Sequence, residues 1–287
     1  MVGLGLALGF AAGRLCATLA RGFRDQTVGG GLLMRAIVAI ASTIGVALIV
    51  APPAFASDVA KSWGKAVVYV AGGPVPGGVA GIKTAKPAGA LLFMHGCSGI
   101  GTPQQDAHRW AALVSKQGYI VVMPDSMARA DRKPSCDPVA KKAGLFPPVH
   151  GMRLEEINYA AGQIRKQAWF DGKTLFLMGY SEGAVAAVRS KLAGLRGVIA
   201  TSWTCTNSLA TDFDGVFTPP ETPLLTLMHV EDPWFRVPFL KGSCANKIAG
   251  RKNARHVVVP GKGHGTYDSA AARNAVVAFL ATQAAAP

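Results

Sequence analysis

The sequence predicts an α/β fold with a mostly parallel central sheet and helices on both of its faces. Short apolar runs alternate with helical stretches along the chain, and this alternation favours parallel strands joined by crossover helices. Some runs, such as residues 91–94, are continuously apolar, which is typical of strands buried on both faces. Another apolar run, residues 174–178, leads through a serine flanked by glycines directly into an Ala-rich helix.

The first half of the predicted domain contains three strands and one helix. We expect strands at residues 65–70, 91–94 and 119–123, and a helix over 104–117 with Trp110 on its apolar stripe. Residues 124–150 have no clean periodicity and include several prolines. A loop of that length is usually functional or forms a lid.

The second half continues the alternation without an internal repeat or a linker of low complexity. The expected strands are 174–178, 197–201, 223–229 and 256–260, and the expected helices are 152–169, 182–192, one within 236–249, and 267–283. We therefore predict a single domain over residues 57–287.

The amino-terminal segment resembles an export signal. Met34 and Arg35 precede an apolar stretch at residues 36–50, and Ala54-Phe-Ala56 fits a cleavage site. We expect residues 34–56 to be a signal peptide, translation to start at Met34, and residues 1–33 to be an upstream misannotation. The apolar stretch is short for a membrane span, so we expect none after processing, with an uncleaved membrane anchor as the alternative. The protein would then be periplasmic or secreted.

The chain is basic, with a formal net charge of +14. Its Lys and Arg residues are spread along the sequence, and none of the common nucleic-acid-binding motifs is present. We interpret the charge as a solvated surface and expect no nucleic-acid partner. The oligomeric state is left open.

Four cysteines follow the predicted signal peptide: Cys97, Cys136, Cys205 and Cys244. An even number in an oxidising compartment suggests two disulfides, with three connectivities open. We favour Cys97–Cys136 and Cys205–Cys244, because each pair lies in loops after neighbouring strands, and four buried free thiols are the alternative. No Cys-x-x-Cys pair occurs, so we expect no metal site.

The sequence Gly179-Tyr-Ser181-Glu-Gly183 matches the nucleophile elbow, Gly-x-Ser-x-Gly. A serine on a tight strand-to-helix turn has a strained backbone and an exposed hydroxyl. Side chains two residues to either side would collide, so glycine is needed there. The following helix directs its free N–H groups towards the same place. We therefore predict that Ser181 is a nucleophile.

A serine hydroxyl needs an adjacent base, which a carboxylate orients. In an α/β sheet such partners follow the carboxyl ends of strands. Asp232, with Glu231 in reserve, follows the strand at 223–229, and His264 follows the strand at 256–260. Their order in the chain, Ser181, Asp232 and His264, is the one that this architecture uses.

The loop after an early strand commonly supplies one N–H of an oxyanion hole, and the residue after the nucleophile supplies the other. Here these would be the backbone N–H groups of Cys97 and Glu182. His95-Gly96 could instead be only a tight turn. Arg129 or Arg132 in the long loop could hold a substrate carboxylate, with solvated loop charges as the alternative.

At these motifs the chain resembles the α/β-hydrolase superfamily, and within it the exported dienelactone-hydrolase-like branch. The resemblance covers residues 88–281 and implies the α/β-hydrolase fold without a large cap domain. It implies catalytic roles for Ser181, Asp232 and His264, no cofactor, and substrate contacts drawn from the same motifs and the long loop. We expect these contacts from His95, Tyr180, Arg129 and Trp234.

We therefore expect a serine hydrolase that cleaves small ester substrates, similar to carboxylesterases. Dienelactone hydrolases proper have a cysteine in the elbow, and this chain has Ser181, which disfavours that specific substrate. The alternatives are a dienelactone hydrolase, a peptidase or a thioesterase with the same triad, and a non-catalytic binding protein on a hydrolase scaffold.

Overall fold

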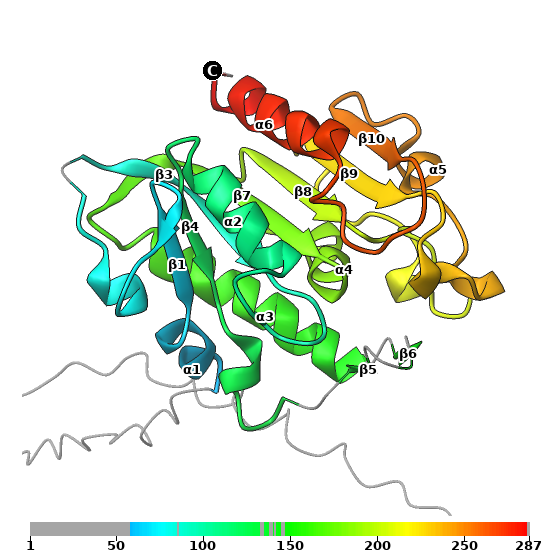
Figure 1. The fold of residues 1–287 in the computed structure, drawn as a ribbon, viewed down its shortest axis with the longest axis horizontal. Coiled ribbons are helices and arrows are strands. Elements are labelled where there is room, and N and C mark those ends of the chain that lie inside the picture. Colours follow the sequence, from blue (N-terminus) through cyan, green and yellow to red (C-terminus); the bar gives the residue numbers. More distant parts are fainter. Residues whose placement is uncertain are drawn as a thin grey trace, which may run out of the picture. The chain divides into compact units, whose positions relative to one another are not determined.

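A mixed sheet with mostly parallel strands is the centre of the computed structural model (Figure 1). The structure describes residues 58–84, 86–132, 135–137, 140, 142–144 and 147–285. The expected start at Met34 and the signal peptide at 34–56 lie outside these residues. Within them, eight strands form the sheet in the order β10-β9-β8-β7-β3-β4-β1-β2. The strands are β1 (Val67–Val70), β2 (Gly73–Pro74), β3 (Ala88–Met94), β4 (Ile120–Met123), β7 (Phe170–Tyr180), β8 (Gly197–Thr201), β9 (Leu224–His229) and β10 (Ala254–Val259).

The strands from β4 to β10 in the sheet order are parallel, whereas β1 pairs antiparallel with β4 and β2. This arrangement confirms the predicted mostly parallel sheet. The strand that precedes Ser181, β7, lies in the middle between β3 and β8. The carboxyl ends of parallel strands meet at one edge, so residues after β3, β7, β9 and β10 come together.

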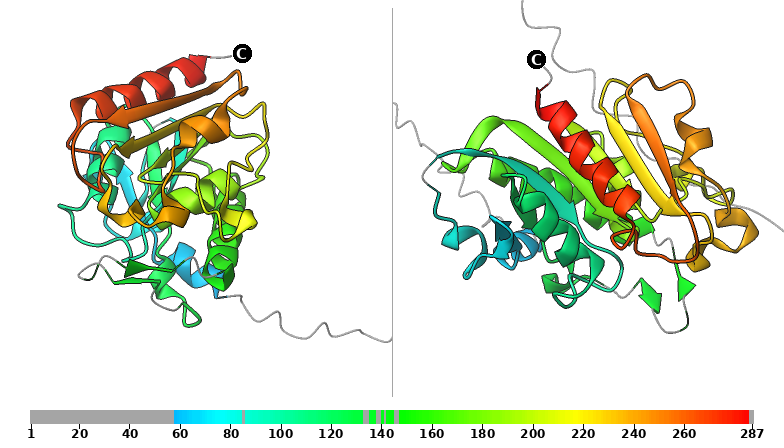
Figure 2. Two further views of the ribbon diagram at one scale, coloured as in Figure 1. Left: turned by 90° about the vertical axis from the view of Figure 1, so that its right-hand side faces the viewer. Right: turned by 45° about the horizontal axis from the view of Figure 1, so that its top comes forward.

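Helices cover both faces of the sheet (Figures 1 and 2). The helices are α1 (Val59–Gly64), α2 (Asp106–Ser115), α3 (Pro147–Ile164), α4 (Glu182–Arg189), α5 (Cys244–Ile248) and α6 (Ala270–Ala285). Side chains on one face of the sheet, such as those of Leu91 and Phe176, pack against α2 and α6. Side chains on the other face, such as those of Leu92 and Leu177, pack against α3 and α4. Because both faces are buried, the central strands are apolar throughout.

Two of the expected helices differ most from the structure, while the ends of the other three lie within three residues of their predicted positions. Helix α3 begins at Pro147 and ends at Ile164, whereas the prediction was 152–169. Its two leading prolines suit the first helical turn, where no intrahelical N–H bond is lost. The expected helix within 236–249 is only α5, preceded by the 3-10 turns η4 (Pro233–Phe235) and η5 (Pro238–Leu240).

The described residues within 124–150 include several regular elements. These are the 3-10 turn η2 (Ser126–Ala128), a hairpin of β5 (Cys136–Asp137) and β6 (Lys142–Ala143), and the start of α3. Between β8 and β9 the described residues form a connection with one short turn, η3 (Thr211–Phe213), and no cap domain. A further 3-10 turn, η1 (Gly78–Gly81), follows β2.

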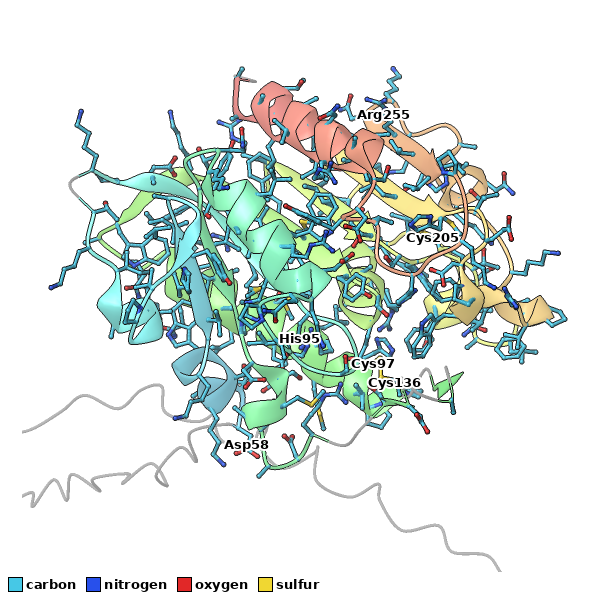
Figure 3. All side chains as sticks on the ribbon, viewed as in Figure 1. Asp58, His95, Cys97, Cys136, Cys205 and Arg255 are labelled. Carbon is cyan, nitrogen blue, oxygen red and sulfur yellow. A yellow bond between two sulfur atoms is a disulfide. The ribbon has the colours of Figure 1, made fainter. Side chains whose placement is uncertain are left out.

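Both predicted disulfides are present. One joins Cys97, after β3, to Cys136 in β5. The other joins Cys205, after β8, to Cys244 at the start of α5. Each bridge fastens a loop at the carboxyl edge of the sheet to the segment that covers it, as Figure 3 shows for Cys97 and Cys136.

Candidate active site

Ser181 lies on the turn between β7 and α4, with φ 55° and ψ −118°. A positive φ is strained for a residue with a Cβ, and such strain is typical of a nucleophile elbow. The flanking glycines are required by close backbone contacts. A Cβ on Gly179 would lie 2.1 Å from the Gly183 carbonyl oxygen, and a Cβ on Gly183 would lie 2.0 Å from that of Met94.

The structure brings together the three residues that the sequence singles out. His264 Nε2 lies 2.9 Å from Ser181 Oγ, and His264 Nδ1 lies 2.8 Å from Asp232 Oδ2. Asp232 is 4% exposed and its other oxygen accepts a hydrogen bond from the Trp234 N–H at 3.0 Å. Glu231, the reserve candidate, is exposed. The three side chains therefore form a continuous hydrogen-bonded chain.

Aromatic rings surround the imidazole of His264. The ring centroids of Tyr180, Trp234 and Phe235 lie 5.4, 5.2 and 5.8 Å from it. The Ser202 hydroxyl donates a hydrogen bond to the His264 carbonyl, which holds the loop that carries the ring. Burial raises the pKa of the Tyr180 hydroxyl. The rings limit how far the imidazole can turn away from Ser181.

The expected oxyanion donors lie beside Ser181. A Cβ on Gly96 would lie 3.5 Å from Ser181 Cβ, so the turn that leads into Cys97 packs against the elbow. Glu182 is the first residue of α4, where an N–H has no intrahelical acceptor. The Cys97 N–H donates to no backbone carbonyl among the described residues.

A buried cluster of charges lies beneath the elbow. The Glu182 carboxylate accepts from Arg132 Nη2 at 2.8 Å and from the Ser135 hydroxyl, and it lies 3.7 Å from Arg153 Nε. Arg153 also pairs with Glu156 at 2.8 Å, and both of these side chains are fully buried. The cluster therefore joins the elbow to α3 and to the segment before β5.

Two sequence expectations for this region need correction. Arg129 is only 6% exposed and pairs with Asp131 and Glu155, and Arg132 is 9% exposed and pairs with Glu182. Neither arginine lines the cavities next to Ser181, and neither is a solvated loop charge. Arg132 serves a buried ion pair, whereas the buried Arg129 side chain pairs with two partly exposed carboxylates.

His95 is also structural. Its ring is fully buried, and its Nδ1 donates to the Gly96 carbonyl at 2.7 Å while Nε2 accepts from the Ser126 N–H at 3.0 Å. Burial, together with the nearby Arg153 charge, holds the pKa of His95 well below its ordinary value. The neutral ring thus ties the loop after β3 to η2 and positions Cys97 (Figure 3). It lines neither cavity.

Two cavities have Ser181 and His264 in their walls. The first, of about 190 Å³, is mostly apolar, and its wall includes Val185, Trp203, Trp234, Phe235, Phe239 and Leu240. The second, of about 570 Å³, is more polar, and its wall includes Gln104, Gln105, Asp106, Tyr180, Trp234 and Lys262. Of the expected substrate contacts, Tyr180 and Trp234 therefore lie at the site.

Sequence reasoning missed several residues of the apolar cavity. His150 and Trp203 form part of its wall, but they come from α3 and from the loop after β8. No local motif marks either residue, because only the folding of distant segments places them near Ser181. Among the described residues, no three His, Cys, Asp or Glu side chains gather as a metal site. No helix in that part of the chain is long and apolar enough to cross a membrane.

Comparison with known proteins finds similarity in structure only. No family model matches the sequence, and no curated protein matches it either. Est1E from Butyrivibrio proteoclasticus, solved with ferulic acid bound, has a TM-score of 0.53 at 11% identity; the match covers 77% of this chain and 95% of that chain. The esterase Pf2001 of Pyrococcus furiosus has a TM-score of 0.51 at 13% identity, over 68% of this chain and 83% of its own.

TT1662 from Thermus thermophilus has a TM-score of 0.51 at 17% identity, and the match covers 77% of this chain and 94% of that chain. Together with the sheet order and the elbow, these similarities show that the chain has the α/β-hydrolase fold. At such identities the likeness concerns the fold alone.

Proposed function

We propose that the protein is a serine hydrolase, similar to carboxylesterases, that cleaves small esters through a covalent acyl-enzyme. The observation that carries this proposal is the hydrogen-bonded chain from Ser181 through His264 to Asp232. Ser181 and His264 line two cavities, which we assign to the two sides of an ester. A binding protein would have no use for that arrangement on a strained elbow.

In the proposed reaction, Ser181 Oγ attacks the ester carbonyl carbon while His264 Nε2 takes the hydroxyl proton. The tetrahedral intermediate collapses as the bond to the alcohol breaks, and His264 returns the proton to the leaving oxygen. A water molecule then gives a proton to His264 and attacks the acyl carbon. The bond between that carbon and Ser181 Oγ breaks while His264 passes the proton to Oγ, which releases the acid and regenerates Ser181. Asp232 orients the imidazole and stabilises its charged form.

Two backbone N–H groups would stabilise the oxyanion. Cys97 is held from one side by its disulfide to Cys136 and from the other by the buried His95. Glu182 is held by the ion pairs of its side chain with Arg132. Donors fixed in advance in this way cost no reorganisation during the reaction.

The similar structures support an esterase. Pf2001 is named an esterase, and Est1E holds ferulic acid, an aromatic carboxylic acid of the kind that ester hydrolysis releases. The fold hosts other chemistries as well, so the assignment rests on the site and not on the fold.

We also propose that the protein is exported, with residues 34–56 removed as a signal peptide. Two disulfides within the described region fit an oxidising compartment. Amino-terminal sequencing of the protein from its native cells tests this. A mature terminus near Ser57 is expected, and a peptide from residues 1–33 would contradict it.

The test of the activity is hydrolysis of a series of p-nitrophenyl esters by the wild-type protein and by Ser181→Ala. We expect turnover of short-chain esters by the wild type and its loss in the variant. A folded, oxidised protein without activity on any ester would refute the proposal. Parallel assays with thioesters and peptides separate an esterase from the other hydrolases that use the same three residues.

A further inference from the structure

The apolar cavity contains two polar groups that the fold does not use. His150 is fully buried, and neither of its ring nitrogens has a hydrogen-bond partner in the described part of the structure. Trp203, 2% exposed, has an indole N–H that is likewise without a partner there. Both residues belong to the wall of the cavity beside Ser181. Buried polar atoms are nearly always paired, so two exceptions in one cavity wall need an explanation.

Apolar packing holds the rings of His150 and Trp203 in place but gives their polar atoms no hydrogen-bond partner. The His150 ring stands edge-on to Phe213 with centroids 4.8 Å apart, and the Trp203 ring stands edge-on to Phe235 at 5.4 Å. Apolar neighbours of this kind hold a ring in place but accept no hydrogen bond. The two polar groups therefore have no partner in the described part of the structure, although both residues form part of the cavity wall.

His150 is a neutral ring at ordinary pH. Burial, reinforced by the charges of Arg189, Arg153 and Arg132, lowers the pKa of His150 to about 3. A neutral imidazole offers one donor and one acceptor, and the indole of Trp203 offers a donor only. A hydroxyl group, which both donates and accepts, is the partner that matches both residues.

The size of the cavity limits what can carry that hydroxyl. An apolar cavity of about 150 Å³ holds one benzene molecule, and this cavity has about 190 Å³. It therefore has room for one ring with a small substituent. The aromatic side chains of Trp203, Trp234 and Phe235 in its wall suit a flat ring.

We propose that the apolar cavity binds a hydroxylated aromatic ring of the ester substrate and that His150 selects for its hydroxyl. This inference rests on the proposed esterase function and names the substrate class of that site. Trp203 donates the second hydrogen bond to the same group. His150 is thus a specificity-determining residue of the cavity wall and takes no part in the proton transfers.

The test compares matched ester pairs that differ only in a ring hydroxyl. Methyl 4-hydroxycinnamate and methyl cinnamate place the ring on the acyl side, whereas 4-hydroxyphenethyl acetate and phenethyl acetate place it on the alcohol side. For the wild type we expect kcat/KM for the hydroxylated ester to exceed that of its partner roughly tenfold in one of the two pairs.

Variants then locate the origin of the preference. His150→Phe keeps a flat ring but cannot form hydrogen bonds, and it should abolish the preference while hydrolysis of the unhydroxylated ester continues. His150→Gln, which can donate and accept, should restore part of the preference. As a control, His256→Phe replaces a histidine that is only partly buried and lies on β10 outside both cavities, and it should leave the preference unchanged.

Two results would overturn the inference: no hydroxyl preference in either pair, or a preference that His150→Phe leaves intact. If His150→Phe does not fold, calorimetric titration of Ser181→Ala decides, with 4-hydroxycinnamate and cinnamate if the acyl-side pair shows the preference, and with 4-hydroxyphenethyl alcohol and phenethyl alcohol if the alcohol-side pair does. Equal affinities would then refute the role of the hydroxyl. Failure of the esterase proposal looks different, because in that case neither member of either pair is hydrolysed.

Discussion

Replacing Glu182 by glutamine should both destabilise the protein and slow its reaction. The carboxylate accepts from Arg132 at 2.8 Å and from Ser135, and it lies 3.7 Å from Arg153. Glutamine keeps the shape and one acceptor oxygen but removes the negative charge. The buried guanidinium groups of the cluster then face one carboxylate fewer.

The size of the effect follows from burial. Removing one partner of a buried ion pair costs about 3–5 kcal/mol of stability. Arg153 retains Glu156 at 2.8 Å, so the lower end applies, about 3 kcal/mol. For a domain of this size the melting temperature should fall by about 6–12 °C. The activity should fall by more than the unfolded fraction explains, because the N–H of the same residue is a proposed oxyanion donor.

Thermal unfolding and kcat for a p-nitrophenyl ester, measured below the transition, provide the assay. Glu155→Gln is the matched control, because Glu155 pairs with Arg129 at 2.9 Å but is 45% exposed. Arg129 keeps Asp131 at 3.0 Å, and the loss of such a solvent-exposed carboxylate should cost about 1 kcal/mol or less. The control should retain its kcat.

A double variant, Glu182→Gln with Arg132→Gln, tests the cause. Removing both charges should recover part of the stability that the single substitution loses. If Glu182→Gln unfolds at the same temperature as the wild type, or if the double variant loses the sum of both single effects, the cluster does not hold the elbow in the manner described.

Three further outcomes are expected. Gly183→Ala should abolish soluble active protein, because its Cβ would lie 2.0 Å from the Met94 carbonyl oxygen. Gly162→Ala in α3, which has open space around it, should instead raise the stability by about 0.5–1 kcal/mol. Thermal unfolding of both variants tests this. Cys136→Ser should lower the free energy of unfolding in urea by about 4 kcal/mol, because the disulfide closes a 39-residue loop. It should also lower kcat, and an unchanged kcat would show that the disulfide does not position the oxyanion hole. The folded-state pKa of His150 lies below its unfolded value, so the unfolded chain binds the extra proton. As the pH falls from about 6.5 to 3, the free energy of unfolding of the wild type should therefore decrease by up to about 1.4 kcal/mol per pH unit more than that of His150→Phe. Urea unfolding at several pH values tests this, and the same pH dependence in both proteins would contradict it.

The parts of the fold that depend on local pattern follow from the sequence. Strand β8 has the predicted bounds, 197–201, because an apolar run between turn residues marks both of its ends. The elbow and the positions of Asp232 and His264 follow because each comes directly after a strand. Parallel strands then bring these separate sequence positions to one edge of the sheet.

What the sequence could not show depends on contacts between distant segments. The start of α3 at Pro147 was missed because prolines suggest a loop when no helical period surrounds them. Arg132 and Glu182 are 50 residues apart, and nothing local predicts that their charges would be buried together. His150 was passed over for the same reason, since its place in the cavity wall is set by how α3 packs beside α4.

Covalent labelling of Ser181 tests the central proposal most directly. The wild-type protein would be treated with a fluorophosphonate, digested, and analysed by mass spectrometry alongside an assay of residual ester hydrolysis. We predict one phosphonyl group on the peptide that contains Ser181, loss of activity in proportion to labelling, and no label in Ser181→Ala or after unfolding. Labelling of another residue, or full activity in a protein labelled at Ser181, would contradict the assignment.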